Sequence, residues 1–203
     1  MDAGRLNERI EILALDQREQ EFSWKRIDRT WAQVEMSGER NLYEGDNTNP
    51  FASAGAGAEL TRFLLRRRGL TPHHAIRWQG RHYLITGVAL CGRNHLEAVG
   101  VCVQPAACIA RRPTAGKDSL KRPLGGTEEI ARFPAAVAEE RREYRPQSPM
   151  ARAEAVYTLT TPKAVQLREG DLVEVDGVDY HLTAVHLRGE YQNEYEIRRE
   201  WDL

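Results

Sequence analysis

The chain has 203 residues, a formal net charge of −1, 41% hydrophobic residues and 29% charged residues. This length suffices for one large or two small domains, and the near-zero charge gives no bulk electrostatic reason to expect nucleic-acid binding. No stretch approaches the roughly 18 apolar residues that read as a membrane-spanning helix, and the first residues lack the apolar core of a signal peptide, so we expect a protein that starts in the cytosol.

The first third of the chain predicts a long, half-buried hairpin followed by a loop. Apolar and charged residues alternate over 6–15 and again over 24–35, with a polar turn over 16–23. Residues 37–58 lose this period, and small and turn-forming residues dominate there. A loop of this length is usually functional or disordered, and both interpretations stay open. Residues 59–68 return to strand and end in a basic run, Arg66-Arg67-Arg68.

One stretch of the chain occurs twice. Gly80–Leu90 recurs 97 residues later as Gly177–Leu187, with glycine, tyrosine, threonine, valine and the closing leucine in register. Each copy predicts a β-hairpin whose glycine takes a positive φ in the turn. Gly87 and Ala184 fall inside the returning strands and indicate a bulge or a close backbone approach. The alternative is two unrelated hairpins with common strand chemistry.

These elements predict an all-β fold of two small, SH3-like β-barrels in tandem. Six strands in residues 1–104, the last over 96–103, suit a closed or nearly closed barrel. Residues 105–126 carry three prolines, Gly125-Gly126 and five basic residues, and predict a linker. Residues 127–203 predict a second, diverged barrel. Its expected strands are 130–138, 156–161, the second hairpin and 194–201; 139–153 is expected to be loop.

The second half matches the first incompletely. We align residues 130–138 with the strand containing Trp31, so that Phe133 and Val137 stand for Trp31 and Val34. No segment of the second half clearly answers the strand over 6–15. The second barrel is therefore either shorter or completed by another segment.

No pattern typical of catalysis is present. The sequence has no GxSxG, GxxxxGK[ST] or HExxH motif, and no GxGxxG after a strand. Its three cysteines, Cys91, Cys102 and Cys108, form no CxxC pair, which disfavours a disulfide framework or a zinc site. We therefore expect no catalytic residues, no cofactor and no metal. An enzyme with an unfamiliar site stays a minor alternative.

Several motifs of the first half together resemble the head–tail joining proteins of long-tailed bacteriophages, also called head-closure or stopper proteins. The resemblance covers residues 4–104 and rests on Gly4–Ile12, Trp31–Val34, Gly38-Glu39 and Arg77–Ile85. It implies a small β-barrel with a long loop between its second and third strands. It also implies a homo-oligomeric ring, six- or twelve-fold, in the neck of the virion, assembled in the host cytoplasm. The implied partners are the portal or adaptor, the tail terminator or tail tube protein, and packaged double-stranded DNA in the channel, with no membrane.

The loop is where this resemblance places function. A gate across the channel or a docking arm would use residues of low packing ability and one local anchor. The candidate residues are Asp46, Asn47, Asn49, Pro50, Phe51, Gly55 and Gly57.

The chain departs from the family pattern after residue 104, because family members are commonly one barrel. The second barrel could face the tail, decorate the ring or fill a neighbouring position in it. Beside the neck protein, a non-catalytic β-barrel module that grips a peptide or another protein stays open. Ring symmetry, host and the direction in which the loop points are not determined by the sequence.

Overall fold

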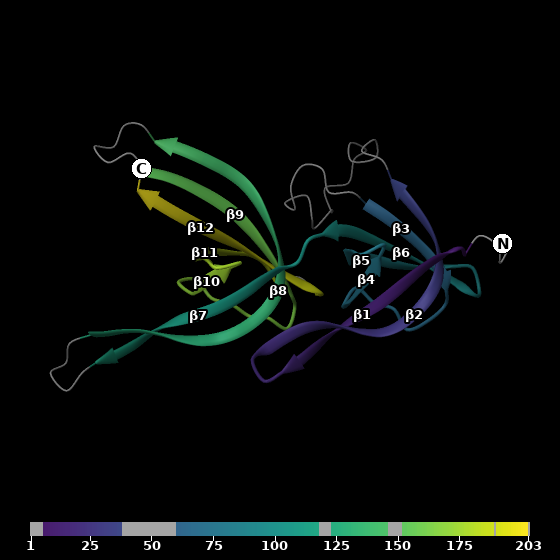
Figure 1. Cartoon of the computed structure of the whole chain (residues 1–203), viewed down its shortest axis with the longest axis horizontal. Coiled ribbons are helices and arrows are strands. Elements are labelled where there is room, and N and C mark those ends of the chain that lie inside the picture. The colour runs from purple at the N-terminus through teal and green to yellow at the C-terminus, as the bar shows by residue number, and fades with distance from the viewer. Residues whose placement is uncertain (1–5, 38–59, 118–122, 146–151, 189, 203) are drawn as a thin grey trace. The chain divides into compact units, whose positions relative to one another are not determined.

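The computed structural model describes residues 6–37, 60–117, 123–145, 152–188 and 190–202. These residues contain strands and no α-helix, which confirms the all-β prediction. The strands are β1 (Glu8–Arg18), β2 (Glu21–Ser37), β3 (Leu60–Arg66), β4 (His74–Trp78), β5 (Arg81–Cys91), β6 (His95–Val103), β7 (Ala106–Lys117), β8 (Pro123–Arg145), β9 (Arg152–Pro162), β10 (Leu172–Val175), β11 (Val178–Arg188) and β12 (Gln192–Asp202) (Figure 1).

The chain forms two compact units. The first consists of Met1–Asp16 and Trp24–Gln104, and the second of Gln17–Ser23 and Pro105–Leu203. The tip of the first hairpin thus belongs to the second unit, where the Arg132 amide donates to the Gln20 carbonyl at 2.8 Å.

The two barrels have the same topology. The first runs β1-β4-β5-β6-β3-β2 and closes through the β1–β2 pairing, and the second runs β7-β10-β11-β12-β9-β8 and closes through β7–β8. Each strand of the second barrel is therefore the counterpart of the strand six places earlier. This confirms the prediction of tandem small barrels and shows that the internal repeat extends over all the strands.

The repeated hairpins match residue by residue. Ile76 pairs with Tyr83 in the first barrel, and Val173 pairs with Tyr180 in the second, each 97 residues later. The turn glycines have φ values of 77° at Gly80 and 85° at Gly177, as predicted. The residue before each glycine also has a positive φ, 49° at Gln79 and 47° at Asp176, so both central residues are left-handed as in a type I′ turn. The register shifts between Ile85 and Gly87 and between Leu182 and Ala184, which confirms the predicted bulges.

The linker predicted over 105–126 is wrong for most of its length. Residues 106–117 form β7, which pairs with β8 and with β10 as β1 pairs with β4. It is the first strand that the second half was expected to lack. The prediction took the prolines as evidence against a strand. Pro113 is compatible with one, because it lies beyond the part of β7 that pairs with β10, and its missing amide proton removes no ladder hydrogen bond to β10.

The loop predicted over 139–153 is also largely strand. β8 continues to Arg145 and β9 begins at Arg152, and their backbones stay paired over this stretch. Backbone pairing does not require apolar side chains, so a charged composition did not exclude strand here. Val137 is the counterpart of Val34, as the alignment predicted. Three residues earlier in each strand, the counterpart of Trp31 is Pro134 and not the predicted Phe133.

The two cores fill the same space with different residues. In the first, Phe63 on β3 lies opposite Ala98 on β6; in the second, Leu159 lies opposite Tyr195. All four are buried, with Leu159 at the position of Phe63 and the larger Tyr195 at the position of Ala98, so the two cores are packed differently at this strand pair. The core of the first barrel comprises Ile10, Ile12, Ala32, Phe63, Leu65, Leu70, Ile76, Trp78, Tyr83, Ile85, Leu96 and Ala98.

Candidate functional site

The predicted loop residues lie outside the described residues, so Asp46, Asn47, Asn49, Pro50, Phe51, Gly55 and Gly57 stay predictions. The two ends of their segment are described. Ser37 at the end of β2 pairs with Leu60 at the start of β3. The segment 38–59 therefore leaves and re-enters the first barrel on neighbouring strands at one end of β3. Met36, beside this point, is 58% exposed.

The outer face of β2 carries exposed apolar side chains. Ile27 is 56% exposed and Trp31 is 52% exposed. The Arg9 guanidinium carbon lies 5.9 Å from the centroid of the Trp31 ring, within the range of a cation–π contact. Exposed Trp together with Arg is typical of protein-binding surfaces. This face is a candidate docking surface.

A carboxylate on β1 gathers three arginines. Glu11 accepts from Arg26 at 3.1 Å and from Arg29 Nε at 2.9 Å, and Arg77 lies 3.5 Å away. The hydrogen bonds from Arg26 and Arg29 lower the pKa of Glu11. A carboxylate held ionised in this way stabilises neighbouring strands and is a poor proton acceptor near neutral pH.

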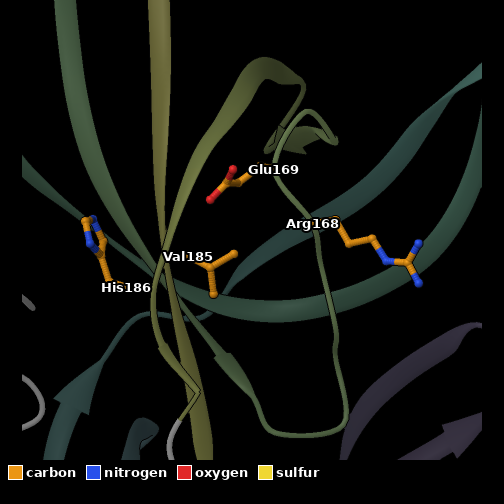
Figure 2. A pocket seen from close by; sticks show the side chains of 4 residues that line it. All are labelled: Arg168, Glu169, Val185 and His186. Atoms are coloured by element: carbon orange, nitrogen blue, oxygen red, sulfur yellow. The ribbon is translucent and has the colours of Figure 1, made fainter.

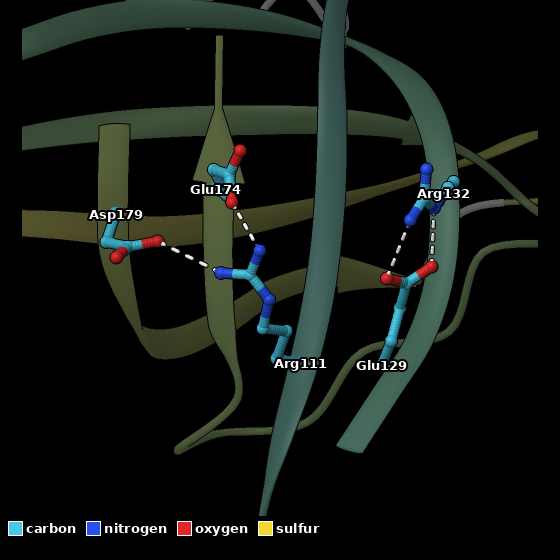
Figure 3. Close-up of polar contacts among 5 residues, drawn as sticks. All are labelled: Arg111, Glu129, Arg132, Glu174 and Asp179. Carbon is cyan, nitrogen blue, oxygen red and sulfur yellow. Dashed lines mark hydrogen bonds and ion pairs between the residues drawn. The ribbon is translucent and has the colours of Figure 1, made fainter. Parts of the chain in front are cut away.

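The second barrel carries a comparable network on its outer surface (Figure 3). Arg111 on β7 reaches Glu174 on β10 and lies 3.5 Å from Asp179 on β11, so one guanidinium bridges three adjacent strands. Glu129 accepts two hydrogen bonds from Arg132, which lower its pKa. Each carboxylate has a cationic partner, which is typical of a solvated sheet face.

One open pocket of about 530 Å³ lies in the second barrel and is lined by Arg168, Glu169, Val185 and His186 (Figure 2). In this view the Arg168 guanidinium points away from the other three side chains. His186 Nε2 lies 3.5 Å from Glu196, whose carboxylate also accepts from Thr183 at 2.6 Å. The four lining residues include no serine, cysteine or threonine.

A partly buried ion pair and two buried polar side chains hold the segment between β9 and β10 onto the second barrel. Asp171, 3% exposed in its side chain, accepts from Arg112 Nε and Nη2, both at 2.8 Å. Asn193 donates to the Val165 carbonyl at 2.8 Å, and the Tyr195 hydroxyl donates to the same carbonyl at 3.1 Å. These groups satisfy backbone atoms of a strandless segment and have a structural role.

Two buried titratable groups have strongly shifted pKa values. Burial, and secondarily Arg77, lowers the pKa of His82 to about 4. Burial, and secondarily Asp176, raises the pKa of Cys108 to about 12, which makes this thiol unreactive. Within the described residues, no group of three His, Cys, Asp or Glu side chains could hold a metal ion. A helix long and apolar enough to cross a membrane is likewise not found in the described part of the chain.

The fold defines the class of this protein: an all-β chain of two six-stranded barrels of one topology. No protein-family model matches it, and a search of curated proteins found no similar sequence. Among solved structures, it is similar to the phage-like element PBSX protein xkdH from Bacillus subtilis, with a TM-score of 0.33 and 12% sequence identity over 47% of this chain and 95% of that one. A likeness of that size carries no argument for a shared fold or a shared role.

Sequence reasoning missed one surface feature. It singled out Arg66-Arg67-Arg68 but did not connect this run with Arg93, because the two are brought together by strand pairing. The available signal was compositional: residues 60–104 contain seven arginines and one acidic residue, Glu97.

Proposed function

We propose that this chain is a structural protein of a bacteriophage neck, which forms a ring between the portal or adaptor and the tail. The observation that carries the proposal is the position of the long segment 38–59. It lies between the second and third strands of a small barrel, where the resembled family has its loop, and the resembled motifs flank it in the expected order. Gly4–Ile12 leads into β1, Trp31–Val34 lies in β2, and Arg77–Ile85 spans the β4–β5 hairpin.

The ring is homo-oligomeric and closes through head-to-tail contacts, as a structure on a rotationally symmetric channel requires. Its partners are copies of itself, the portal or adaptor, the tail terminator or tail tube protein, and the DNA that passes through the channel. The exposed Trp31 and Ile27 of β2 supply an apolar centre for one of these contacts. The protein acts by assembly and not by catalysis.

The second barrel repeats the topology of the first, so it is a second module of the same kind within one chain. Its surface differs, because the exposed large apolar side chains of the described residues, such as Ile27 and Trp31, belong to the first barrel. We assign it to a contact with a neighbouring ring, separate from the contacts of the first barrel.

The alternative is a non-catalytic module that binds a peptide or a protein outside a virion. The exposed apolar face of β2 favours it equally, since such a face serves any protein partner. The two functions differ in what they require of the partner: only the neck protein needs a portal-bearing head.

Co-sedimentation with tail-less, DNA-filled heads of the same phage tests the proposal. A neck protein binds saturably, and the bound protein restores tail attachment. A Trp31→Ala variant keeps its fold but binds less, because the side chain is half exposed in the free protein. Absence of co-sedimentation at every protein concentration contradicts the neck role, and retention of a soluble protein partner under the same conditions supports the alternative.

A further inference from the structure

The first barrel has a basic end, formed by Arg66, Arg67 and Arg93. Arg66 closes β3 and pairs in register with His95. The Arg67 amide donates to the Asn94 carbonyl at 2.9 Å, which joins the residues after β3 to the turn that carries Arg93. All three arginines are exposed. They lie at the opposite end of β3 from the segment 38–59.

The charge of this end is not neutralised. Two arginines of residues 60–104 are in ion pairs with the first hairpin, Arg68 with Asp28 at 2.5 Å and Arg77 with Glu11 at 3.5 Å. Within the described residues, no hydrogen bond or ion pair involves the guanidinium of Arg66, Arg67 or Arg93. The nearest acidic residue on β6 is Glu97, two residues from His95.

The backbone that presents these arginines is fixed. Leu70 is 6% exposed and belongs to the barrel core. Arg68 also donates to Thr30 on β2 at 2.6 Å, and Thr71 bonds the ring of His74 at 2.9 Å. Groups held on a rigid scaffold lose little freedom when they bind a ligand. The backbone positions of the three arginines are therefore fixed before binding, while their exposed side chains are ordered by the ligand.

The second barrel shows that the fold does not need positive charge here. Its segment between β9 and β10 carries two basic residues, Lys163 and Arg168, and two acidic ones, Glu169 and Asp171. Its β11–β12 turn has Glu190 where the first barrel has Arg93. The same scaffold is thus neutral or acidic at this end in one copy and strongly basic in the other.

We propose that the basic end of the first barrel contacts the phosphate backbone of duplex DNA. The planar guanidinium matches phosphate geometry, and separate arginines on an open surface suit an extended polyanion with repeated charges. The contacts read no sequence, because phosphates carry none. This inference rests on the proposed neck function for the identity of the polyanion, since a neck encloses DNA.

The test uses the full-length protein and a fluorescent DNA duplex of random sequence, with anisotropy measured over a series of salt concentrations. If each of three arginines neutralises one phosphate, the slope of log affinity against log salt is about −2.7. The variant R66Q/R67Q/R93Q should bind about tenfold more weakly or worse at low salt, with a slope near zero. The control K25Q/R62Q/R168Q removes the same net charge from exposed positions elsewhere and should bind like the parent. Thermal melts show whether each variant is folded.

Three outcomes overturn or separate the proposals. Absence of duplex binding by the parent, or an equal loss in the variant and the control, overturns the DNA contact. If the parent does not bind DNA and only R66Q/R67Q/R93Q loses attachment to heads, the basic end binds an acidic protein. This outcome overturns the DNA contact and leaves the neck role intact. If the parent binds DNA as expected but does not sediment with heads, the DNA contact stands and the neck role fails.

Discussion

Tyr83 and Tyr180 occupy equivalent positions in the two barrels but differ in their surroundings. Tyr83 is fully buried, and its ring lies edge-on to Phe63 with centroids 5.2 Å apart. Tyr180 is 8% exposed and lies edge-on to Tyr157 at 5.3 Å. The buried Tyr83 hydroxyl has no hydrogen-bond partner among the described residues. The ring and not the hydroxyl is what the first barrel uses.

Because the ring of Tyr83 is buried and its hydroxyl has no partner, two substitutions at this position should have different effects on stability. Tyr83→Ala removes a buried ring and should lower the free energy of unfolding of the first barrel by about 3–5 kcal/mol. Tyr83→Phe removes only an unsatisfied buried hydroxyl and should leave stability unchanged or raise it. Urea unfolding of both variants measures this. A Tyr83→Phe variant that loses as much as Tyr83→Ala would show that the hydroxyl is bonded after all.

His82 predicts a pH dependence of stability. Its ring is 8% exposed, packs against Trp24 with centroids 5.4 Å apart, and has no hydrogen-bond partner for Nε2 among the described residues. Its pKa is about 4 in the folded chain, against 6.5 for an unperturbed histidine. Between pH 4 and pH 6.5, His82 is protonated in the unfolded chain and neutral in the folded chain. Stability therefore falls as the pH falls from 6.5 to about 4, by about 3 kcal/mol over the window.

His82→Phe keeps an aromatic ring against Trp24 and has no proton to bind. The difference in unfolding free energy between the parent and this variant should change across that pH window and be flat above it. Carboxylates such as Glu11 titrate equally in both proteins and cancel in the difference. A constant difference from pH 7 to pH 4 would mean that His82 is not held neutral.

At the level of elements, the bulge in β5 and the glycine of β6 place different demands on the chain. A Cβ on Gly100 would lie 3.3 Å from the Leu84 carbonyl oxygen and 3.3 Å from Tyr83 Cβ. A Cβ on Gly87 would meet nothing within 4 Å, and the equivalent bulge of the second barrel already carries Ala184. β6 therefore needs its glycine and β5 does not.

We predict that Gly100→Ala destabilises the first barrel by about 1–3 kcal/mol, because the backbone oxygen of Leu84 cannot yield as a flexible side chain would. Gly87→Ala is the matched control and should be neutral or stabilising by up to about 1 kcal/mol, through the lower entropy of the unfolded chain. Thermal unfolding of the two variants decides it. Equal losses would indicate that the cost is general to glycine replacement in this sheet.

At the level of the whole molecule, the chain is a duplicated barrel in which only the first copy has a long insertion after its second strand. The ends of that insertion, Ser37 and Leu60, are paired, so the barrel does not need the intervening residues to close. A deletion of Asp46–Gly57 should therefore leave the melting temperature of the protein nearly unchanged.

The same deletion tests the predicted role of the loop. A gate predicts rings that still assemble on heads but leak DNA, measured as DNA accessible to nuclease. A docking arm predicts that assembly or tail attachment is lost while necks already in place retain their DNA. A deletion variant that attaches to heads, retains DNA and accepts tails would contradict both roles.

Elements whose signal is local were predictable from the sequence. Alternation placed β1, β2 and β3, and the Gly80 and Gly177 turns followed from a backbone conformation that glycine tolerates. A small residue inside each returning strand predicted the bulges at Gly87 and Ala184.

Elements that depend on a neighbouring strand became visible only in the folded chain. β7 is a strand because β8 and β10 pair with it, although its proline and basic residues are typical of a linker. The charged end of β8 is a strand because β9 lies beside it. The basic end exists only because β3 and β6 are adjacent, which brings Arg66 and Arg67 beside Arg93. Long-range pairing supplies hydrogen bonds and proximity that no local pattern encodes, so these features became visible only in the folded chain.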